Sequence, residues 1–272
     1  MLECVVNVSE GRRLDVVDRV GAAAGDDLLD VHTCADHHRS VLTLLGEDAP
    51  RAVATAAVAE LDLRSHTGAH PRIGVLDVVP FVPLGDTTMN AALAARDDFA
   101  AWIAETLGVP VFLYGPERSL PDVRRGAFTT LAPDVGPNAP HPSAGAVAVG
   151  ARRPLVAYNL WLRDSDLATA RRLAASLRSP AVRALGLQVG GEVQVSMNLV
   201  DPEVVGPADV WDTVSAEVEV ARAELVGLLP DAVLHAVAEG RWSELDLASD
   251  RTIEWRTARR ARRLRASGRR QG

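Results

Sequence analysis

The stretch HTGAHPRIGVLDVVPFVPLG, residues 66–85, joins a polar loop to a long apolar run. A glycine and a proline in the loop disfavour a helix, so the i, i+4 spacing of its two histidines does not predict a helical metal pair. The apolar run 73–82 is typical of a strand buried on both faces, and its one acid is Asp77. The sequence therefore predicts a loop bearing His70 and Arg72 that is anchored on a core strand, a placement suited to catalysis.

The hydrophobic pattern around this strand predicts the same order of elements twice along the chain. Both runs read strand, helix, strand, strand, helix, strand, which is the split βαβ pattern. We therefore expect an α/β (α+β) fold of two ferredoxin-like βαββαβ subdomains with a ligand cleft between them. The expected elements are strands 3–8, 27–31, 40–46 and 73–82 with helices 14–24 and 49–63, then strands 155–162, 182–189, 192–199 and 224–228 with helices 165–177 and 208–223.

A segment rich in proline and glycine, 131–152, follows an expected helix at 97–107 and an expected strand at 109–114. Disorder is one interpretation of such composition. An ordered loop is the other, since apolar residues are interleaved with the prolines and an apolar strand follows at once. The expected divisions are an N-terminal subdomain with this loop at 1–150, a C-terminal subdomain at 151–235 and a helical or disordered Arg-rich tail at 236–272.

Composition narrows the class of protein. The net charge of -7 does not favour a nucleic-acid binder, and all 29 basic residues are Arg, which excludes Schiff-base lysine chemistry and a P-loop lysine. Cys4 and Cys34 have no metal-ligand spacing to a partner. No run approaches the roughly 18 apolar residues of a membrane span, and the first residues do not read as a secretory signal. A cytoplasmic protein is expected.

Several motifs together resemble the glutamate formimidoyltransferase (formiminotransferase) family, in the monofunctional form without a cyclodeaminase domain. The resemblance is collinear over about residues 3 to 230. It implies transfer of a formimino group from N-formimino-L-glutamate to tetrahydrofolate, giving 5-formimidoyltetrahydrofolate and L-glutamate in histidine degradation. The motifs are NVSEG (7–11), HHRSVLTLLG (37–46), HTGAHPRIGVLDVVPFVPL (66–84), VPVFLYG (109–115), PDVGP (133–137), HPSAGAVAVGAR (141–152), LVAYN (155–159) and QVSMNLVD (194–201).

The resemblance implies that His70 is the catalytic histidine and that the Pro/Gly loop contacts folate. Histidine suits this step because it exchanges protons near neutral pH. Asp36 or Asp77 is expected to orient His70 or to stabilise the amidinium, and the sequence does not choose between them. The expected folate contacts are Gly136, Pro137, Asn138, Pro142, Ser143 and Gly145; the expected substrate contacts are Arg39 and Arg72, as bidentate carboxylate partners, with Asn159, Gln194 and Asn198.

Alternatives stay open at this level. The chain is also compatible with a folate-dependent formyl or formimino transferase that uses a different donor, or with a catalytically weak folate-binding or interaction protein. His66 is expected either to support the catalytic residues from behind or to face solvent. Tetrahydrofolate is expected as a co-substrate, and no metal is expected. His38 and Trp161 depart from the family pattern, which has asparagine at both positions. We expect small-molecule substrates and a homodimer, no membrane and no nucleic acid, although the Arg-rich tail leaves RNA or an acidic partner as an alternative.

Overall fold

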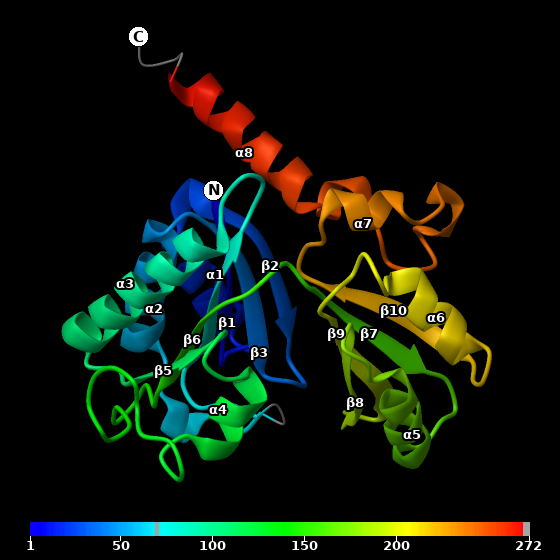
Figure 1. Cartoon of the computed structure of the whole chain (residues 1–272), viewed down its shortest axis with the longest axis horizontal. Helices are drawn as coiled ribbons and strands as arrows, with labels where there is room; N and C mark the ends of the chain where they lie inside the picture. Colours follow the sequence, from blue (N-terminus) through cyan, green and yellow to red (C-terminus); the bar gives the residue numbers. More distant parts are fainter. Residues whose placement is uncertain (69–70, 269–272) are drawn as a thin grey trace. The chain divides into compact units, whose positions relative to one another are not determined.

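The computed structural model describes residues 1–68 and 71–268 and divides into two compact units, Met1–Arg153 and Pro154–Gly272 (Figure 1). Each unit has its own sheet and its own apolar core. The expected fold class is confirmed: both units contain the βαββαβ order, and in both the four strands lie in the ferredoxin-like sequence fourth, first, third, second.

The first unit extends this pattern to a six-stranded sheet of order β2-β3-β1-β4-β6-β5. Strands β2, β3, β1 and β4 pair antiparallel, whereas β6 is parallel to both β4 and β5. Its elements are β1 (Leu2–Val8), α1 (Leu14–Ala22), β2 (Leu28–Cys34), β3 (Arg39–Leu45), α2 (Asp48–Glu60), β4 (Leu76–Pro83), α3 (Met89–Leu107), β5 (Val111–Tyr114), α4 (Leu120–Gly126) and β6 (Val147–Ala151), with 3-10 turns at Gly25–Asp27 and Leu63–Ser65.

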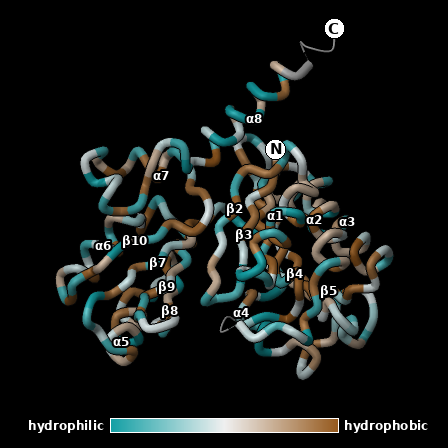
Figure 2. The backbone as a smooth tube through the Cα atoms, turned by 180° about the vertical axis from the view of Figure 1, so that it is seen from behind, coloured by the Kyte–Doolittle hydropathy of each residue, from teal (hydrophilic) through white to brown (hydrophobic). Residues whose placement is uncertain are grey.

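Alternation along β1 decides which face of this sheet is apolar. Cys4, Val6 and Val8 are almost fully buried and belong to the core that includes side chains of α1, α2 and α3, so Asn7 lies on the other face. The tube around β4 and β5 is largely brown in Figure 2, as expected for strands that are buried on both faces. Polar side chains on the face opposite the helices are therefore exceptions that need partners.

A β-bulge places Asp77 on that opposite face. The β1–β4 register shifts so that Asn7 is opposite Val78 while Val8 is opposite Leu76, which leaves Asp77 as the extra residue. Asp77 is 1% exposed. The acid that stands alone in an apolar strand is thus buried, but away from the helix-side core.

The second unit contains a four-stranded sheet of order β10-β7-β9-β8, and its neighbouring strands all pair antiparallel. The predicted hairpin turn is present at Gly190 and Gly191, between β8 and β9. Helices α5, α6 and α7 contribute to the core on one face of this sheet. The elements are β7 (Val156–Leu162), α5 (Leu167–Leu177), β8 (Val182–Val189), β9 (Glu192–Leu199), α6 (Pro207–Ser215), β10 (Val220–Val226), α7 (Asp231–His235) and α8 (Ile253–Gly268), with 3-10 turns at Glu239–Arg241 and Ser249–Arg251.

Two helix boundaries differ from the sequence-based expectation by eight residues each. The helix expected at 208–223 ends at Ser215, because β-strand alternation takes over and β10 buries Ala223 and Leu225. The helix expected at 97–107 begins at Met89, because the Thr88 side chain accepts a hydrogen bond from the Ala91 backbone and caps an additional alanine-rich segment.

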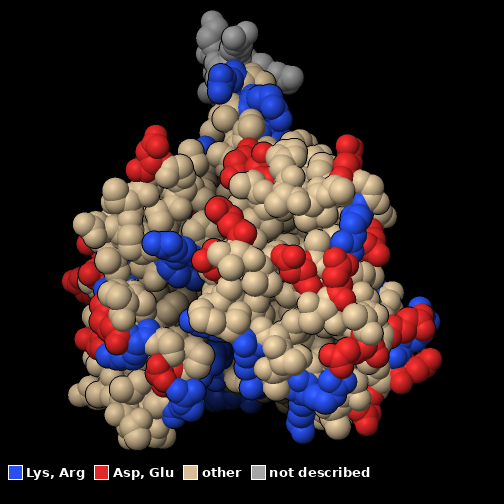
Figure 3. All heavy atoms as spheres, turned by 45° about the vertical axis from the view of Figure 1, so that its right-hand side comes forward, with Lys and Arg blue, Asp and Glu red and all other residues tan. Residues whose placement is uncertain are grey.

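The Pro/Gly-rich segment is ordered and includes β6, so the disorder interpretation is wrong. The tail forms α8 through Gly268, and its Arg side chains gather along the helix in Figure 3. Residues 251–272 hold nine Arg and one acid, so the remaining chain has a formal charge of about -15.

Close packing of α5 on β8 predicts which glycine of this sheet is indispensable. A Cβ at Gly186 would lie 2.3 Å from the Arg171 backbone nitrogen, whereas a Cβ at Gly191 would have no atom within 4 Å. Gly186→Ala should therefore lower the free energy of unfolding by about 1–3 kcal/mol through overpacking. Urea denaturation measures the change, with Gly191→Ala as the control; equal effects of the two substitutions would contradict this packing.

Candidate functional site

The segment that carries the predicted catalytic histidine connects α2 to β4. His70 lies outside the described residues, but both sides of it are described. The segment packs along the Pro/Gly-rich loop: the Leu63 backbone donates to the Ser143 carbonyl at 2.7 Å, and the Ala146 backbone donates to the Ile73 carbonyl at 2.9 Å. Residues 61–75 are called the catalytic segment below, after the predicted role of His70. This segment and the predicted folate loop are therefore neighbours within the first unit.

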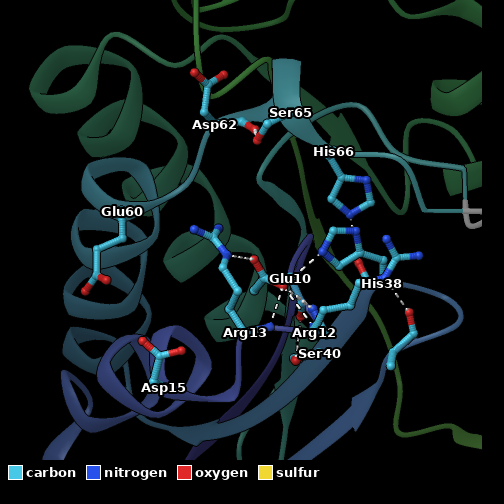
Figure 4. A network of polar contacts seen from close by, with 12 residues as sticks. Glu10, Arg12, Arg13, Asp15, His38, Ser40, Glu60, Asp62, Ser65 and His66 are labelled. Atoms are coloured by element: carbon cyan, nitrogen blue, oxygen red, sulfur yellow. Dashed lines mark hydrogen bonds and ion pairs between the residues drawn. The ribbon is translucent and has the colours of Figure 1, made fainter.

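His66 is held by the backbone on both sides of its ring. Its Nε2 lies 2.8 Å from the His38 carbonyl, and its Nδ1 lies 3.1 Å from the Gly68 backbone nitrogen. The two imidazole rings of His38 and His66 stack with centroids 4.0 Å apart and planes 15° apart (Figure 4). His66 is thus a structural neighbour of the catalytic segment rather than a solvent-facing side chain.

Two arginines hold the described residues that flank His70. Arg72 donates to the Gly68 carbonyl at 2.8 Å and to the His66 carbonyl at 3.2 Å. Arg124 of α4 donates to the Pro71 carbonyl and, at 2.6 Å, to the Asp77 carboxylate. Arg72, predicted to bind substrate, is engaged by the chain's own backbone, and Arg124 is a site residue that the sequence analysis missed.

Glu10 is the most highly coordinated acid near this segment. Its Oε1 accepts from the backbone N–H groups of Gly11, Arg12 and Arg13 at 2.9, 2.9 and 3.1 Å, and lies 2.9 Å from His38 Nε2. The Arg13 side chain donates to Oε2 at 2.6 Å. Burial alone would raise the pKa of Glu10, but these hydrogen bonds outweigh it and lower the pKa to about 2. Glu10 is therefore a carboxylate at neutral pH.

A second polar network joins three motifs on the face of the sheet opposite α1, α2 and α3. Arg39 donates from Nε to Asn7 Oδ1 at 3.1 Å and from Nη1 to Asp77 at 3.3 Å. Burial lowers the pKa of Arg39 to about 10, and Asp77 opposes this while Arg124 adds to it, so Arg39 stays protonated near neutral pH. Two guanidinium groups on one carboxylate leave a net positive site, which suits anionic substrate groups.

The two candidate orienting acids, Asp36 and Asp77, lie in different surroundings. Asp77 lies in this network and also accepts from the Ile73 backbone at 2.9 Å, which ties it to the catalytic segment. Asp36 lies exposed in the turn between β2 and β3. Asp77 is accordingly the acid with contacts to the described neighbours of His70.

Close packing within the chain explains the glycines of the Pro/Gly loop. Gly136 and Gly145 have φ of 91° and 73°. Their absent Cβ atoms would lie 2.9 Å from Ala104 Cβ and 2.4 Å from the Ile73 carbonyl oxygen. Close approach to the chain itself therefore requires glycine at both positions, while Pro137, Asn138 and Pro142 are exposed and Ser143 is half-buried.

The predicted substrate residues of the second unit share one face of its sheet. Asn159 is paired with Ser196, and its β7 neighbour Trp161 is paired with Gln194; Asn198 follows two residues further along β9. Asn159 and Trp161 donate to Glu224 Oε2 at 3.0 and 2.8 Å. Gln194 is fully buried, whereas Asn198 is exposed. This face is polar, as predicted, and lies opposite the helix-side core.

Among residues 1–68 and 71–268, no group of three or more His, Cys, Asp or Glu side chains is arranged to hold a metal ion. Within the same residues, no helix is both long enough and apolar enough to cross a bilayer. The sequence features His37–His38 and Asp36 therefore form no metal cluster with other described acids or thiols; His37 Nδ1 instead lies 3.0 Å from Cys34 Sγ.

Comparison with known proteins agrees with this architecture. The formiminotransferase domain, N-terminal subdomain, matches residues 1–152. Glutamate formimidoyltransferase of Streptococcus pyogenes serotype M1 is 36% identical over 275 residues, covering 88% of this chain and 92% of that protein. The Thermoplasma acidophilum enzyme of the same name is 34% identical over 277 residues, covering 88% and 91%. Formimidoyltransferase-cyclodeaminase of Sus scrofa is 37% identical over 281 residues. That alignment covers 88% of this chain and 52% of the Sus scrofa protein.

The chain belongs to the formiminotransferase family. It is accordingly a transferase of formimidoyl groups.

The Glu10 cluster predicts a pH-dependent contribution to stability. Glu10→Gln keeps the shape but removes the charge, so it should lower the free energy of unfolding at pH 7 by about 1–3 kcal/mol. Because the pKa of Glu10 falls from 4.5 to about 2 on folding, the difference should be full above pH 4.5 and shrink as the pH falls toward 2. Chemical denaturation across this range measures it. Glu219→Gln, which removes an exposed ion pair, is the control, and a pH-independent difference for Glu10→Gln would refute the assignment.

Proposed function

We propose that this chain transfers the formimino group from N-formimino-L-glutamate to tetrahydrofolate, giving 5-formimidoyltetrahydrofolate and L-glutamate in histidine degradation. The observation that carries the proposal is the tethered segment around His70: described side chains hold the backbone on both sides of it, next to the predicted folate loop. Membership of the formiminotransferase family supports the same reaction.

The chemistry needs one well-placed proton carrier. A folate ring nitrogen attacks the formimino carbon and forms a new C–N bond, and His70 accepts the proton that this nitrogen loses. The C–N bond to glutamate then breaks, and the departing amine takes up a proton from His70. Histidine performs both transfers near neutral pH. The amidine carbon is already electrophilic, so the proposed reaction needs neither a metal nor a covalent nucleophile.

The positive network supplies the binding side of the proposal. Arg39 and Arg124 share the Asp77 carboxylate, so their combined charge favours the carboxylates of glutamate or of folate. Asp77 orients this arrangement because it bonds the Ile73 backbone as well as both guanidinium groups. We further propose that Asn159, Gln194 and Asn198 bind substrate through their polar side chains.

A second candidate is transfer from a different formyl or formimino donor to the same folate. Trp161 is the observation that favours it: its indole donates to Glu224, and the Arg222 guanidinium stacks 4.1 Å from its ring centroid. An aromatic ring with a guanidinium group on its face therefore occupies a strand position where the family pattern has asparagine. Turnover with formiminoglutamate and with formylglutamate, compared at equal tetrahydrofolate, decides between the donors.

We also propose that the protein is cytoplasmic and forms a homodimer.

His70→Ala should lower kcat by about 10²- to 10⁴-fold, because general acid or base action contributes that much. Folate affinity and the unfolding midpoint should change little, since proton transfer contributes to neither. His66→Ala should lower kcat less. Steady-state kinetics with formiminoglutamate and folate titration measure both effects, with exposed His235→Ala as the control. Normal turnover by His70→Ala would overturn the catalytic assignment.

Tetrahydrofolate should protect residues 134–145 from amide hydrogen exchange. The C-terminal end of this loop lies beside the segment, because the Ser143 and Ala144 carbonyls accept hydrogen bonds from the Leu63 and Val75 backbones. A flat heterocycle bound there would shield the backbone of the loop. Exchange followed by mass spectrometry, with and without a stable reduced folate, measures the protection. Unchanged exchange in this loop, together with protection of another surface, would remove it from the folate site.

A further inference from the structure

The chain that leads into His70 rests on three side chains that form a layered support. Glu10 lies at the base and is 2% exposed, and the His38 ring is bonded to it through Nε2 at 2.9 Å. The His66 ring stacks on the His38 ring, as Figure 4 shows. Because the lowest layer is fixed to three backbone N–H groups at the end of β1, the support is anchored in the sheet.

Hydrogen-bond roles within this support fix the tautomer of His66. A backbone carbonyl only accepts, so His66 Nε2 must carry the proton that it donates to the His38 carbonyl. A backbone N–H only donates, so His66 Nδ1 must offer a lone pair to Gly68. Both ring nitrogens are therefore used, and the ring is neutral. A side chain in this state is a poor candidate for the proton acceptor of the reaction.

The segment fits closely around this ring. A Cβ at Gly68 would lie 2.5 Å from His66 Cε1 and 2.7 Å from the His37 carbonyl oxygen, so the backbone two residues before His70 packs directly on the support. Arg72 donates to the carbonyls of His66 and Gly68 as well. A change at the His66 ring would thus be felt at the Gly68 backbone, in the chain that leads toward His70.

We propose that His66 is a positioning residue for the catalytic segment: held as the neutral Nε2–H tautomer on the Glu10–His38 support, it fixes the backbone that leads into His70. This inference rests on the proposed function only in taking His70 as the reacting group. His66 touches no reacting atom in this scheme, and its contribution is the geometry of its neighbour. Loss of such geometry, even by about 1 Å, costs up to about 10²-fold in rate.

Protonation of His66 would disrupt the arrangement. A proton on Nδ1 removes the acceptor for the Gly68 N–H and places a cation beside the Arg72 guanidinium. Among the described residues, the other charged or titratable groups around the ring are His38, Glu10 and Arg12, whose Nη1 lies 3.4 Å from Thr67 Oγ1.

Burial lowers the pKa of His66, the bond to the His38 carbonyl opposes this, and the charges of Arg72 and His38 lower it further. Positioning is therefore complete above the ordinary histidine pKa and is lost as the pH falls through the lowered one.

Two substitutions separate ring stacking from hydrogen bonding. His66→Phe keeps an aromatic ring on His38 but removes both hydrogen bonds, and kcat should fall by about 10-fold to 10²-fold with little change in KM. His66→Gln restores an N–H donor for the His38 carbonyl and should recover part of that loss. His235→Phe, at an exposed histidine of the second unit, is the matched control. Wild-type kcat in His66→Phe would overturn the proposal, as would an identical loss in His66→Gln and His66→Phe.

The pH profile adds a readout that a merely structural role would not move. In the wild type, protonation of His70 removes the proton acceptor and protonation of His66 lowers kcat further by loosening the support, so the acid limb of kcat should be steeper than a one-proton titration. In His66→Gln the limb should follow one proton. Thermal unfolding of each variant at pH 7 confirms that the comparison is made between folded enzymes. Equal slopes in the two proteins would contradict the role of the neutral tautomer.

Nitrogen-15 NMR of labelled histidines tests the tautomer without any assay of turnover. The His66 signals, assigned from His66→Gln, should show a protonated Nε2 and an unprotonated Nδ1 at pH 7. An imidazolium or the Nδ1–H tautomer would refute the proposal. If formimino transfer is absent in the wild type while the expected tautomer is observed, the proposed function fails and the support for the segment stands.

Discussion

The buried carboxylate of Glu10 is the contact on which the geometry of the site depends. Glu10 lies just after β1. Its carboxylate accepts hydrogen bonds from the backbone N–H groups that lead toward α1, and it holds the His38 side chain in the turn before β3. A buried charge is favourable only when hydrogen bonds replace its water, and here the hydrogen-bond donors come from two separate parts of the chain. The same interaction therefore fixes a strand end, a helix start and a turn.

Arginine has a particular use around the catalytic segment. Arg72 and Arg124 each direct at least two N–H groups at acceptors on the segment or on Asp77, which a planar fork does better than a single ammonium group. Backbone carbonyls of a short loop would otherwise face water. The segment is thus held by Arg72 from its own sequence and by Arg124 from α4, without regular secondary structure in the described part around Gly68 and Arg72.

Local patterning was sufficient to predict the fold. Two-residue periodicity identified the strands, and the glycine pair between β8 and β9 identified their hairpin, because both signals depend only on neighbouring residues. The end of α6 was misjudged because TVSAEVEVARAEL contains both helix formers and strand alternation, and pairing with β7 decides the outcome. Arg124 was missed for a related reason: its partners, Pro71 and Asp77, are distant in sequence. His70 was found by motif, whereas the roles of Glu10 and His66 depend on three-dimensional contacts.

The bulge in β4 has a consequence for how this strand tolerates change. The bulge shifts the alternation of side chains by one residue. Leu76 lies in one phase of the alternation and Val79 and Phe81 lie in the other, so all three reach the helix-side core. In a regular strand, Asp77 would share a face with Val79 and its charge would enter that core. One additional residue thus lets an almost continuous apolar strand present a single carboxylate to the opposite side. Insertions or deletions between Gly74 and Val78 would exchange the two phases, so the length of this short stretch is as constrained as its composition.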